Sequence, residues 1–268
     1  MKRDDEASDS RRTLLAGLAA SAAGAIVGCS RAAARSPEPA PRGPRRKWGL
    51  VIDLDRCSRC AGCVVACQQE NNVPPLGPEA AARMRPIHWM DFLPPAPGNS
   101  AATPIPCMHC EDPPCVKVCP VGATYQSPEG ITAQIWERCI GCRYCMVACP
   151  YARRYFNWSE PRWPGDDPSS LNPDVVPRPR GVVEKCTLCH HRIRAAVERA
   201  RVDEEALNDE ALRWLPACAQ SCPTRAITFG DLADPESEVA RLAASPRATR
   251  LLPEAGTRPK VIYLRETK

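Results

Sequence analysis

Cysteine is the residue type that recurs in this sequence at spacings fit for chemistry, because sixteen of the seventeen cysteines fall into four groups of four. The groups are CSRCAGCVVAC at 57–67, CMHCEDPPCVKVCP at 107–120, CIGCRYCMVACP at 139–150, and a split group with CTLC at 186–189 and CAQSCP at 218–223. In a [4Fe–4S] cluster each iron takes one cysteine thiolate. The pattern therefore predicts four such clusters, whose chemistry is the transfer of single electrons.

The last cysteine of each group is expected to serve a neighbouring cluster. Three closely spaced cysteines wrap around one cube, and small residues such as Ala61, Gly62 and Gly141 let backbone N–H groups approach sulfur. The last cysteine lies on a following helical turn that points away, as in the two-cluster bacterial run. Proline comes directly after it in three groups, whereas the first group has Gln68 there.

Other uses of the cysteines are open at this point. Zinc accepts C-x2-C pairs but leaves the third cysteine of each run without a role. A disulfide scaffold suits an exported chain, yet cysteines so close in sequence are badly placed to bridge one another. The run Cys186-Thr-Leu-Cys189-His190 matches the c-type haem attachment motif. Haem would leave Cys218 and Cys222 without partners, so clusters are favoured, with His190 as a surface or near-cluster residue.

The first 29 residues predict an export signal of the twin-arginine type. The letters SRR at 10–12 precede an apolar run over 14–28 that is too short and too weakly apolar for a membrane span. Cys29 ends a stretch similar to the box at which bacterial lipoproteins are cut and acylated, so it is either lipidated or removed. Clusters are inserted in the cytoplasm, and bound thiolates no longer form disulfides. A thiol-rich chain can therefore be exported, folded, to the periplasm.

Composition and charge set aside other classes of function. Thirty prolines and only three Phe indicate a loop-rich chain whose fold needs stabilisation by bound metal. The net charge is +5, but residues 31–47 alone hold six basic residues and one acidic residue, so no basic face for nucleic acid is implied. Residues 30–47 are instead a Pro/Arg-rich tether. The sequence has no nucleotide-binding loop and no nucleophile–base signature, and we assign no catalytic residue.

Short strands must lead into the cysteine loops. Apolar and β-branched residues predict them at 50–53 and 131–135, with a return strand at 227–229. Residues 193–215, inside the fourth group, have helix-forming composition, and the expected packing residues are Val197, Val202, Leu207 and Leu212. Residues 261–264 are expected to pack on the body of the protein or on a partner.

Three stretches resemble the four-cluster ferredoxin subunits of the complex iron–sulfur molybdoenzyme group: IPCMHCEDPPCVKVCPVGATY, ERCIGCRYCMVACPYARRYFNW and EKCTLCHHR. That group includes the electron-transfer subunits of dimethyl sulfoxide, polysulfide, tetrathionate and formate-dependent nitrite reductase systems, and of alternative complex III. The resemblance covers about residues 48–232. It implies an α+β fold of two loop-rich, ferredoxin-like dicluster units of paired βαβ type, with inserted irregular segments.

By this resemblance the first and fourth groups build one dicluster unit and the second and third groups build the other. The expected boundaries are 48–100 with 181–232 for the first unit, 101–156 for the second, 157–180 for a Pro-rich excursion and 233–268 for a C-terminal docking segment. Relatives with a [3Fe–4S] centre replace one cysteine, often with Trp. No position is replaced here, so four [4Fe–4S] clusters are expected.

The resemblance also implies which cysteines hold each cluster. We name the ligands the first set (Cys57, Cys60, Cys63 and Cys222), the second set (Cys186, Cys189, Cys218 and Cys67), the third set (Cys107, Cys110, Cys115 and Cys149) and the fourth set (Cys139, Cys142, Cys145 and Cys119). Several cations lie near these cysteines in sequence and either raise cluster potentials or neutralise cluster charge: Lys117, Arg138, Arg143, Arg153, Arg154 and Lys185.

The expected function is that of an electron-transfer subunit in an exported, membrane-associated oxidoreductase complex. Its expected partners are an integral membrane quinone-reactive subunit and either a molybdopterin catalytic subunit or a multihaem cytochrome c. The alternative is a free-standing exported redox enzyme, which would need an additional cofactor.

Overall fold

A four-stranded sheet brings the two ends of the cysteine-rich region together. The computed structural model describes residues 46–75, 86–95, 102–163 and 168–267, so the predicted export signal and Cys29 lie outside it. The strand order is β8-β1-β10-β9, and the strands are β1 (Trp48–Asp53), β8 (Ile227–Asp231), β9 (Ala248–Thr249) and β10 (Val261–Leu264). β1 precedes the first cysteine group and β8 follows the last, and they pair antiparallel with Leu50 opposite Phe229.

The sheet forms because its strands are apolar on both faces. On one face Leu50, Phe229 and Tyr263 join the main core. On the other face Val51 and Ile262 pack against α9 (Glu238–Ala243), so β1 is buried from both sides. β10 pairs parallel with β1. The predicted strands at 50–53 and 227–229 are confirmed, and residues 261–264 pack on the body of the protein.

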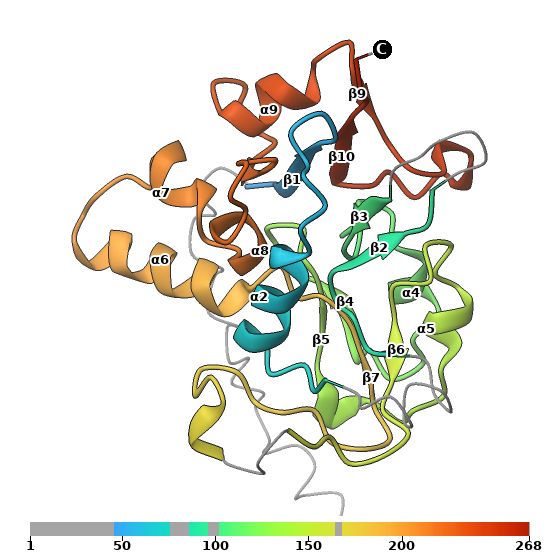
Figure 1. Cartoon of the computed structure of the whole chain (residues 1–268). Helices are drawn as coiled ribbons and strands as arrows, with labels where there is room; N and C mark the ends of the chain where they lie inside the picture. The colour runs from blue at the N-terminus through green and yellow to red at the C-terminus, as the bar shows by residue number, and fades with distance from the viewer. Residues whose placement is uncertain (1–45, 76–85, 96–101, 164–167, 268) are drawn as a thin grey trace, which may run out of the picture. The chain divides into compact units, whose positions relative to one another are not determined.

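Three two-stranded ribbons carry the middle of the chain (Figure 1). They pair β2 (Asp91–Leu93) with β3 (Thr103–Ile105), β4 (Thr124–Gln126) with β5 (Thr132–Gln134), and β6 (Tyr155–Phe156) with β7 (Val183–Glu184). β5 lies inside the strand predicted at 131–135. β6 and β7 close the two ends of the Pro-rich excursion. The described part of that excursion is irregular apart from the 3-10 helix η3 (Pro168–Ser170).

Four short helices carry cysteines. These are α2 (Gly62–Glu70), α4 (Pro114–Lys117), α5 (Tyr144–Val147) and α8 (Ala217–Gln220). α2 packs against α8, and α4 packs against α5. The remaining 3-10 turns are η1 (Trp136–Arg138) and η4 (Pro253–Ala255). Within the described ranges, none of the helices has the length and apolar character that crossing a bilayer requires. The mixture of short helices and strands agrees with the predicted α+β class; the division into two dicluster units remains a prediction.

The insertion inside the fourth cysteine group is helical, as predicted, but is broken into two helices. α6 runs over His190–Val202 and α7 over Asp209–Arg213. Leu212 is buried, and Val197 and Leu207 pack against the main core. Val202 was expected to pack and is instead 73% exposed, because it lies about 180° around α6 from the buried Ile193.

Candidate metal centres

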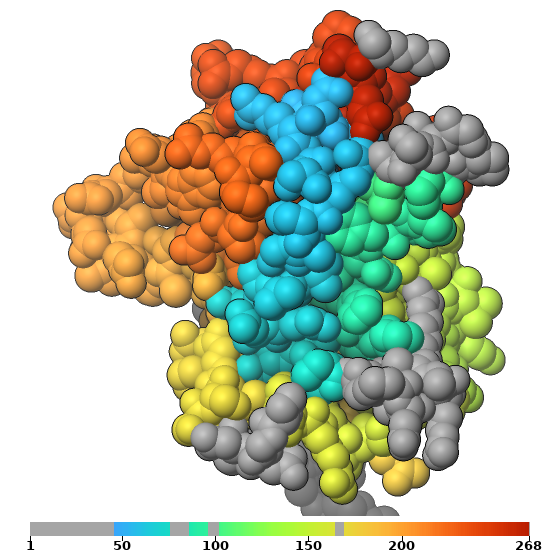
Figure 2. All heavy atoms as spheres, viewed as in Figure 1, coloured from blue at the N-terminus to red at the C-terminus, as the bar shows by residue number. Residues whose placement is uncertain are grey.

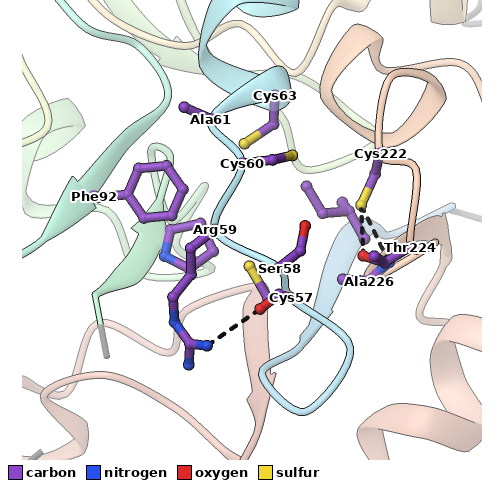
Figure 3. Close-up of a pocket in the computed structure, with 12 residues that line it drawn as sticks. Cys57, Ser58, Arg59, Cys60, Ala61, Cys63, Phe92, Cys222, Thr224 and Ala226 are labelled. Atoms are coloured by element: carbon purple, nitrogen blue, oxygen red, sulfur yellow. Dashed lines mark hydrogen bonds between the residues drawn. The ribbon is translucent and has the colours of Figure 1, made fainter. Parts of the chain in front are cut away.

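The first set surrounds a hollow of about 310 Å³ that is partly open to solvent. Cys57 and Cys60 lie on the loop that leads into α2, Cys63 lies in the first turn of α2, and Cys222 comes from the segment before β8, as Figure 3 shows. Burial, with a smaller effect of the three neighbouring thiols, raises the pKa of Cys63 to about 12. The antiparallel pairing of β1 with β8 explains how Cys222, so distant in sequence, reaches this loop.

The second set lies deeper in the protein. Burial raises the pKa of Cys67 well above its ordinary value, and the nearby thiols of Cys186, Cys189 and Cys218 raise it further. The packing of α2 against α8 brings Cys67 and Cys218 together. Cys186 and Cys189, the two cysteines of the haem-like motif, therefore lie near the other thiols of this set. His190, the third residue of that motif, is half-buried, and burial lowers its pKa to about 4.

The third set surrounds a second hollow of about 310 Å³. Its lining includes Cys107, Cys110, Cys115 and Cys149 together with the side chain of Arg154. Burial and the neighbouring Cys107 thiol raise the pKa of Cys110 to about 12. All four cysteines predicted from the resemblance thus line one space.

The fourth set, like the first, includes one exposed cysteine. Cys145 is buried on α5 and packs in a small cluster with Cys115 and Cys139. Cys142 lies on the same loop as Cys139 and is exposed. Cys119 follows α4, which packs on α5, and its sulfur accepts a hydrogen bond from the N–H of Thr124 at 3.4 Å.

The effects of thiols of one set on the pKa values of thiols of another indicate a linear order of the sets. Cys63 of the first set lies near enough to Cys218 of the second to raise its pKa. Cys107 of the third set does the same to Cys186 of the second. Cys115 of the third set acts likewise on Cys145 of the fourth. The order is therefore first, second, third, fourth, and the exposed Cys60 and Cys142 belong to the two ends.

One backbone conformation recurs in all four cysteine groups. The residue directly before the second cysteine has a positive φ in each group: Arg59 (58°), His109 (41°), Gly141 (70°) and Leu188 (60°). Only Gly141 is a glycine, so the sequence signalled this turn at one position in four. At Gly141 a Cβ atom would lie 2.4 Å from the carbonyl oxygen of Gly181, which also excludes larger residues there. Gly62 has ordinary room for a Cβ atom, but its backbone N–H hydrogen bonds to Cys60 and lowers the pKa of that thiol, in keeping with the expected approach to sulfur.

A second recurring turn follows the Cys-Pro pairs. Gly122, Ala152 and Arg225 each lie three residues after the cysteine, have positive φ and donate their N–H to that cysteine's carbonyl oxygen. The turn then aims a later N–H at sulfur, as for Ala226 to Cys222 at 3.2 Å. The first group has Gln68 in place of proline, and α2 continues through Cys67 to Glu70.

The cations near the cysteines separate into two classes. Arg153, Arg154 and Lys185 are buried. Lys117, Arg138 and Arg143 are exposed; Lys117 pairs with Asp112, and Arg143 stacks on Trp158 with 4.8 Å between guanidinium carbon and ring centroid. The buried class is the one that can act on cluster potentials, because solvent screens charges at the surface.

Sequence reasoning missed several polar residues at the sites. Asn71 is buried and donates from Nδ2 to the sulfur of Cys189 at 3.5 Å. Lys260 is buried, and burial lowers its pKa to about 8. His109 is fully buried between Cys107 and Cys110, and neither ring nitrogen has a hydrogen-bond partner among the described residues. Adjacency to a cysteine was the one available signal for His109.

These residues fit iron–sulfur cubes. All sixteen cysteines in the described ranges are free thiols, and backbone N–H groups point at the sulfurs of Cys119, Cys139, Cys186 and Cys222. Since each thiolate of a cube binds a different iron, the sulfurs of a set must stand apart across the cube. Among the described residues, no three His, Cys, Asp or Glu side chains converge on one metal ion.

Comparisons with known proteins agree with this chemistry. Residues 99–164 match the family model described as a 4Fe-4S dicluster domain. The chain is 49% identical over 228 residues to the menaquinone reductase iron–sulfur cluster-binding subunit of Nitratidesulfovibrio vulgaris, covering 81% of this chain and 88% of that protein. It is 37% identical over 281 residues to the Hdr-like menaquinol oxidoreductase iron–sulfur subunit 1 of Archaeoglobus fulgidus (95% and 97%). It is 34% identical over 235 residues to a tetrathionate reductase subunit of Salmonella typhimurium (85% and 76%).

Proposed function

Because the chain belongs to the family of iron–sulfur electron-transfer subunits of multi-subunit respiratory reductases, we propose that it holds four [4Fe–4S] clusters in a row, one on each set of cysteines. The observation that carries this proposal is the linear order of the sets through Cys63–Cys218, Cys186–Cys107 and Cys115–Cys145. The subunit is not the catalytic one, in keeping with the roles for which its relatives are named.

The residues around each set support one-electron transfer. A [4Fe–4S] cluster supplies a centre that accepts and returns a single electron. The backbone N–H groups of Ala226, Leu188 and Thr124 donate to ligand sulfurs and so favour the added negative charge. The burial of the second and third sets excludes water from the middle of the row.

Partners are proposed at the two ends of the row. At one end Cys60 is exposed at the surface, on the segment from β1 through α2 that lies in blue and cyan across the face drawn in Figure 2. At the other end, the two segments that carry the fourth set also bear exposed apolar side chains, which we name the terminal apolar patch: Val118, Val121, Ile140, Tyr144 and Val147. A quinone-reactive membrane subunit would contact one end and a molybdopterin catalytic subunit or multihaem cytochrome c the other.

The proposed location is the periplasmic face of a membrane, reached by twin-arginine export. The support is the SRR letters at 10–12, the apolar run after them and the menaquinone and menaquinol roles for which two relatives are named. Acylation of Cys29 would add a lipid anchor. Mass spectrometry of the mature N-terminus distinguishes acylation from removal of this residue.

The experiment that tests the function is Cys145→Ser in the assembled complex. Loss of a thiolate of the fourth set should interrupt quinol-linked turnover while the catalytic subunit still turns over with a soluble artificial electron donor. The spectra of the other three clusters report correct folding. Unchanged quinol-linked turnover in a complex that has lost the fourth cluster would overturn the proposed row.

A further inference from the structure

Arg154 is a buried arginine without a carboxylate partner. Its side chain is 1% exposed and lines the hollow of the third set. Nη1 donates to Thr124 Oγ1 at 3.1 Å and to Gln134 Oε1 at 3.0 Å, whereas the buried Nη2 makes no hydrogen bond within the described part of the chain. A buried charge is costly unless something of opposite sign compensates it.

Two other buried arginines of this protein each pair with a carboxylate that neutralises their charge. Arg153, the preceding residue, pairs with Asp91 at 3.1 Å, and Arg178 pairs with Glu184 at 2.6 Å. In the described ranges no Asp or Glu forms such an ion pair with Arg154. The negative charge that the site of Arg154 requires must therefore come from the thiolates and from what they bind.

The thiolates around Arg154 belong to two sets. Arg154 lines the same hollow as Cys115 of the third set, and Cys115 packs in one cluster with Cys145 of the fourth. Thr124 adds a second connection to the fourth set, because it accepts from Arg154 and its own N–H donates to Cys119 Sγ at 3.4 Å. The β4–β5 ribbon thus holds the guanidinium between the third and fourth sets through Thr124 and Gln134, which also bond to each other at 2.8 Å.

We propose that Arg154 is a positioning residue shared by the third and fourth clusters, with Nη2 donating to sulfur and its charge favouring the reduced form of both. This inference rests on the proposed function. It follows that Arg154 raises the reduction potentials of these two clusters and leaves those of the first and second sets unchanged, because the buried charge shares a hollow with Cys115 and is hydrogen-bonded to Thr124, which contacts Cys119.

The test compares Arg154→Gln, Arg154→Lys and Arg153→Gln in the full chain, purified anaerobically and titrated with dithionite under EPR detection. Arg154→Gln is expected to move two of the four reduction transitions to lower potential at unchanged iron content. Arg154→Lys keeps the positive charge but loses the planar guanidinium, so its shift in potential should be smaller than that of Arg154→Gln. Arg153→Gln removes a buried arginine whose charge is already neutralised by Asp91, so it should shift none.

Two results would overturn the inference: unchanged potentials in Arg154→Gln, or an equal shift of all four transitions. If Arg154→Gln loses iron, Thr124→Val decides, because it keeps the charge while removing one oxygen that holds the guanidinium. The inference then requires a shift confined to the same two transitions, and no shift would overturn it. A failure of the proposed function would appear differently, as a wild-type chain without four EPR-active clusters.

Discussion

Asn71 Nδ2 lies 3.5 Å from the sulfur of Cys189 and 3.8 Å from that of Cys67, so one buried amide contacts two thiols of the second set. The same nitrogen donates to the carbonyl oxygen of Cys67 at 3.0 Å, at the C-terminal end of α2. The Asn71 amide therefore both caps the end of α2 and supplies a hydrogen-bond donor to the sulfurs.

Replacing Asn71 with Leu should lower the potential of one cluster. The substitution removes a donor to sulfur and one of two hydrogen bonds to the Cys67 carbonyl, which keeps the bond from the backbone N–H of residue 71 at 3.1 Å, so it should cost about 0.5–1.5 kcal/mol of stability. Asn72→Ala is the matched control, because Asn72 is equally buried but donates to the carbonyls of Asn172 and Val175. The control should lose stability without any change in potential. EPR titration that shows equal shifts in both variants would contradict the role of Asn71.

Gly141→Ala should empty the fourth set. The added methyl would meet the Gly181 carbonyl oxygen at 2.4 Å on a backbone with φ of +70°. We expect a loss of roughly four of about sixteen iron atoms. Gly122→Ala, beside Cys119 of the same set, has a similar φ of +61° but nothing within 4 Å of its Cβ position. It should cost only about 1 kcal/mol of strain and keep its iron. Equal iron in both variants would show that the close approach is not required.

Arg178→Met should weaken the attachment of the excursion to α2. The Arg178 guanidinium pairs with Glu184 and donates to the carbonyls of Asn71 at 2.6 Å and Asn72 at 2.7 Å. Removing it leaves Glu184 buried without its charge partner, at a cost of about 3–5 kcal/mol. The loss of stability is measured as a decrease in the denaturant concentration at which half of the cluster absorbance is lost. Arg180→Met, an exposed neighbour, should change stability by less than about 0.5 kcal/mol.

Val147→Asp should weaken partner binding without affecting the clusters. Val147 is 87% exposed in the terminal apolar patch beside the fourth set. A charge there should reduce affinity for a docked subunit by roughly tenfold or more. Val202→Asp, at a residue 73% exposed at the end of α6, is the control and should bind normally. The measurement is co-purification of the partner subunits with each variant. Intact assembly of Val147→Asp would show that the terminal apolar patch is not part of the interface.

The sequence was most informative where the pattern is local. The spacing of the cysteines identified the four groups, and β-branched runs located the strands at 50–53 and 227–229. The pairing of distant groups came from the resemblance, since no local pattern reports that β1 and β8 are neighbours. The ligand sets themselves remain predictions that the gathered thiols support.

Other features could not be read because they depend on tertiary contacts. Arg59, His109 and Leu188 adopt positive φ without being glycine, since the loop as a whole imposes the turn. Asn71 and Lys260 reach the sites from outside the cysteine motifs. Val202 is the exception, because the helical period places it opposite the buried Ile193, whereas composition alone does not separate it from Val197.

The central claim is tested most directly by measuring iron and acid-labile sulfide per chain in anaerobically purified protein. Four clusters predict about sixteen of each, with no disulfide among the cysteines from 57 to 222. A content far below this, or sulfurs found bonded to one another, would contradict the account.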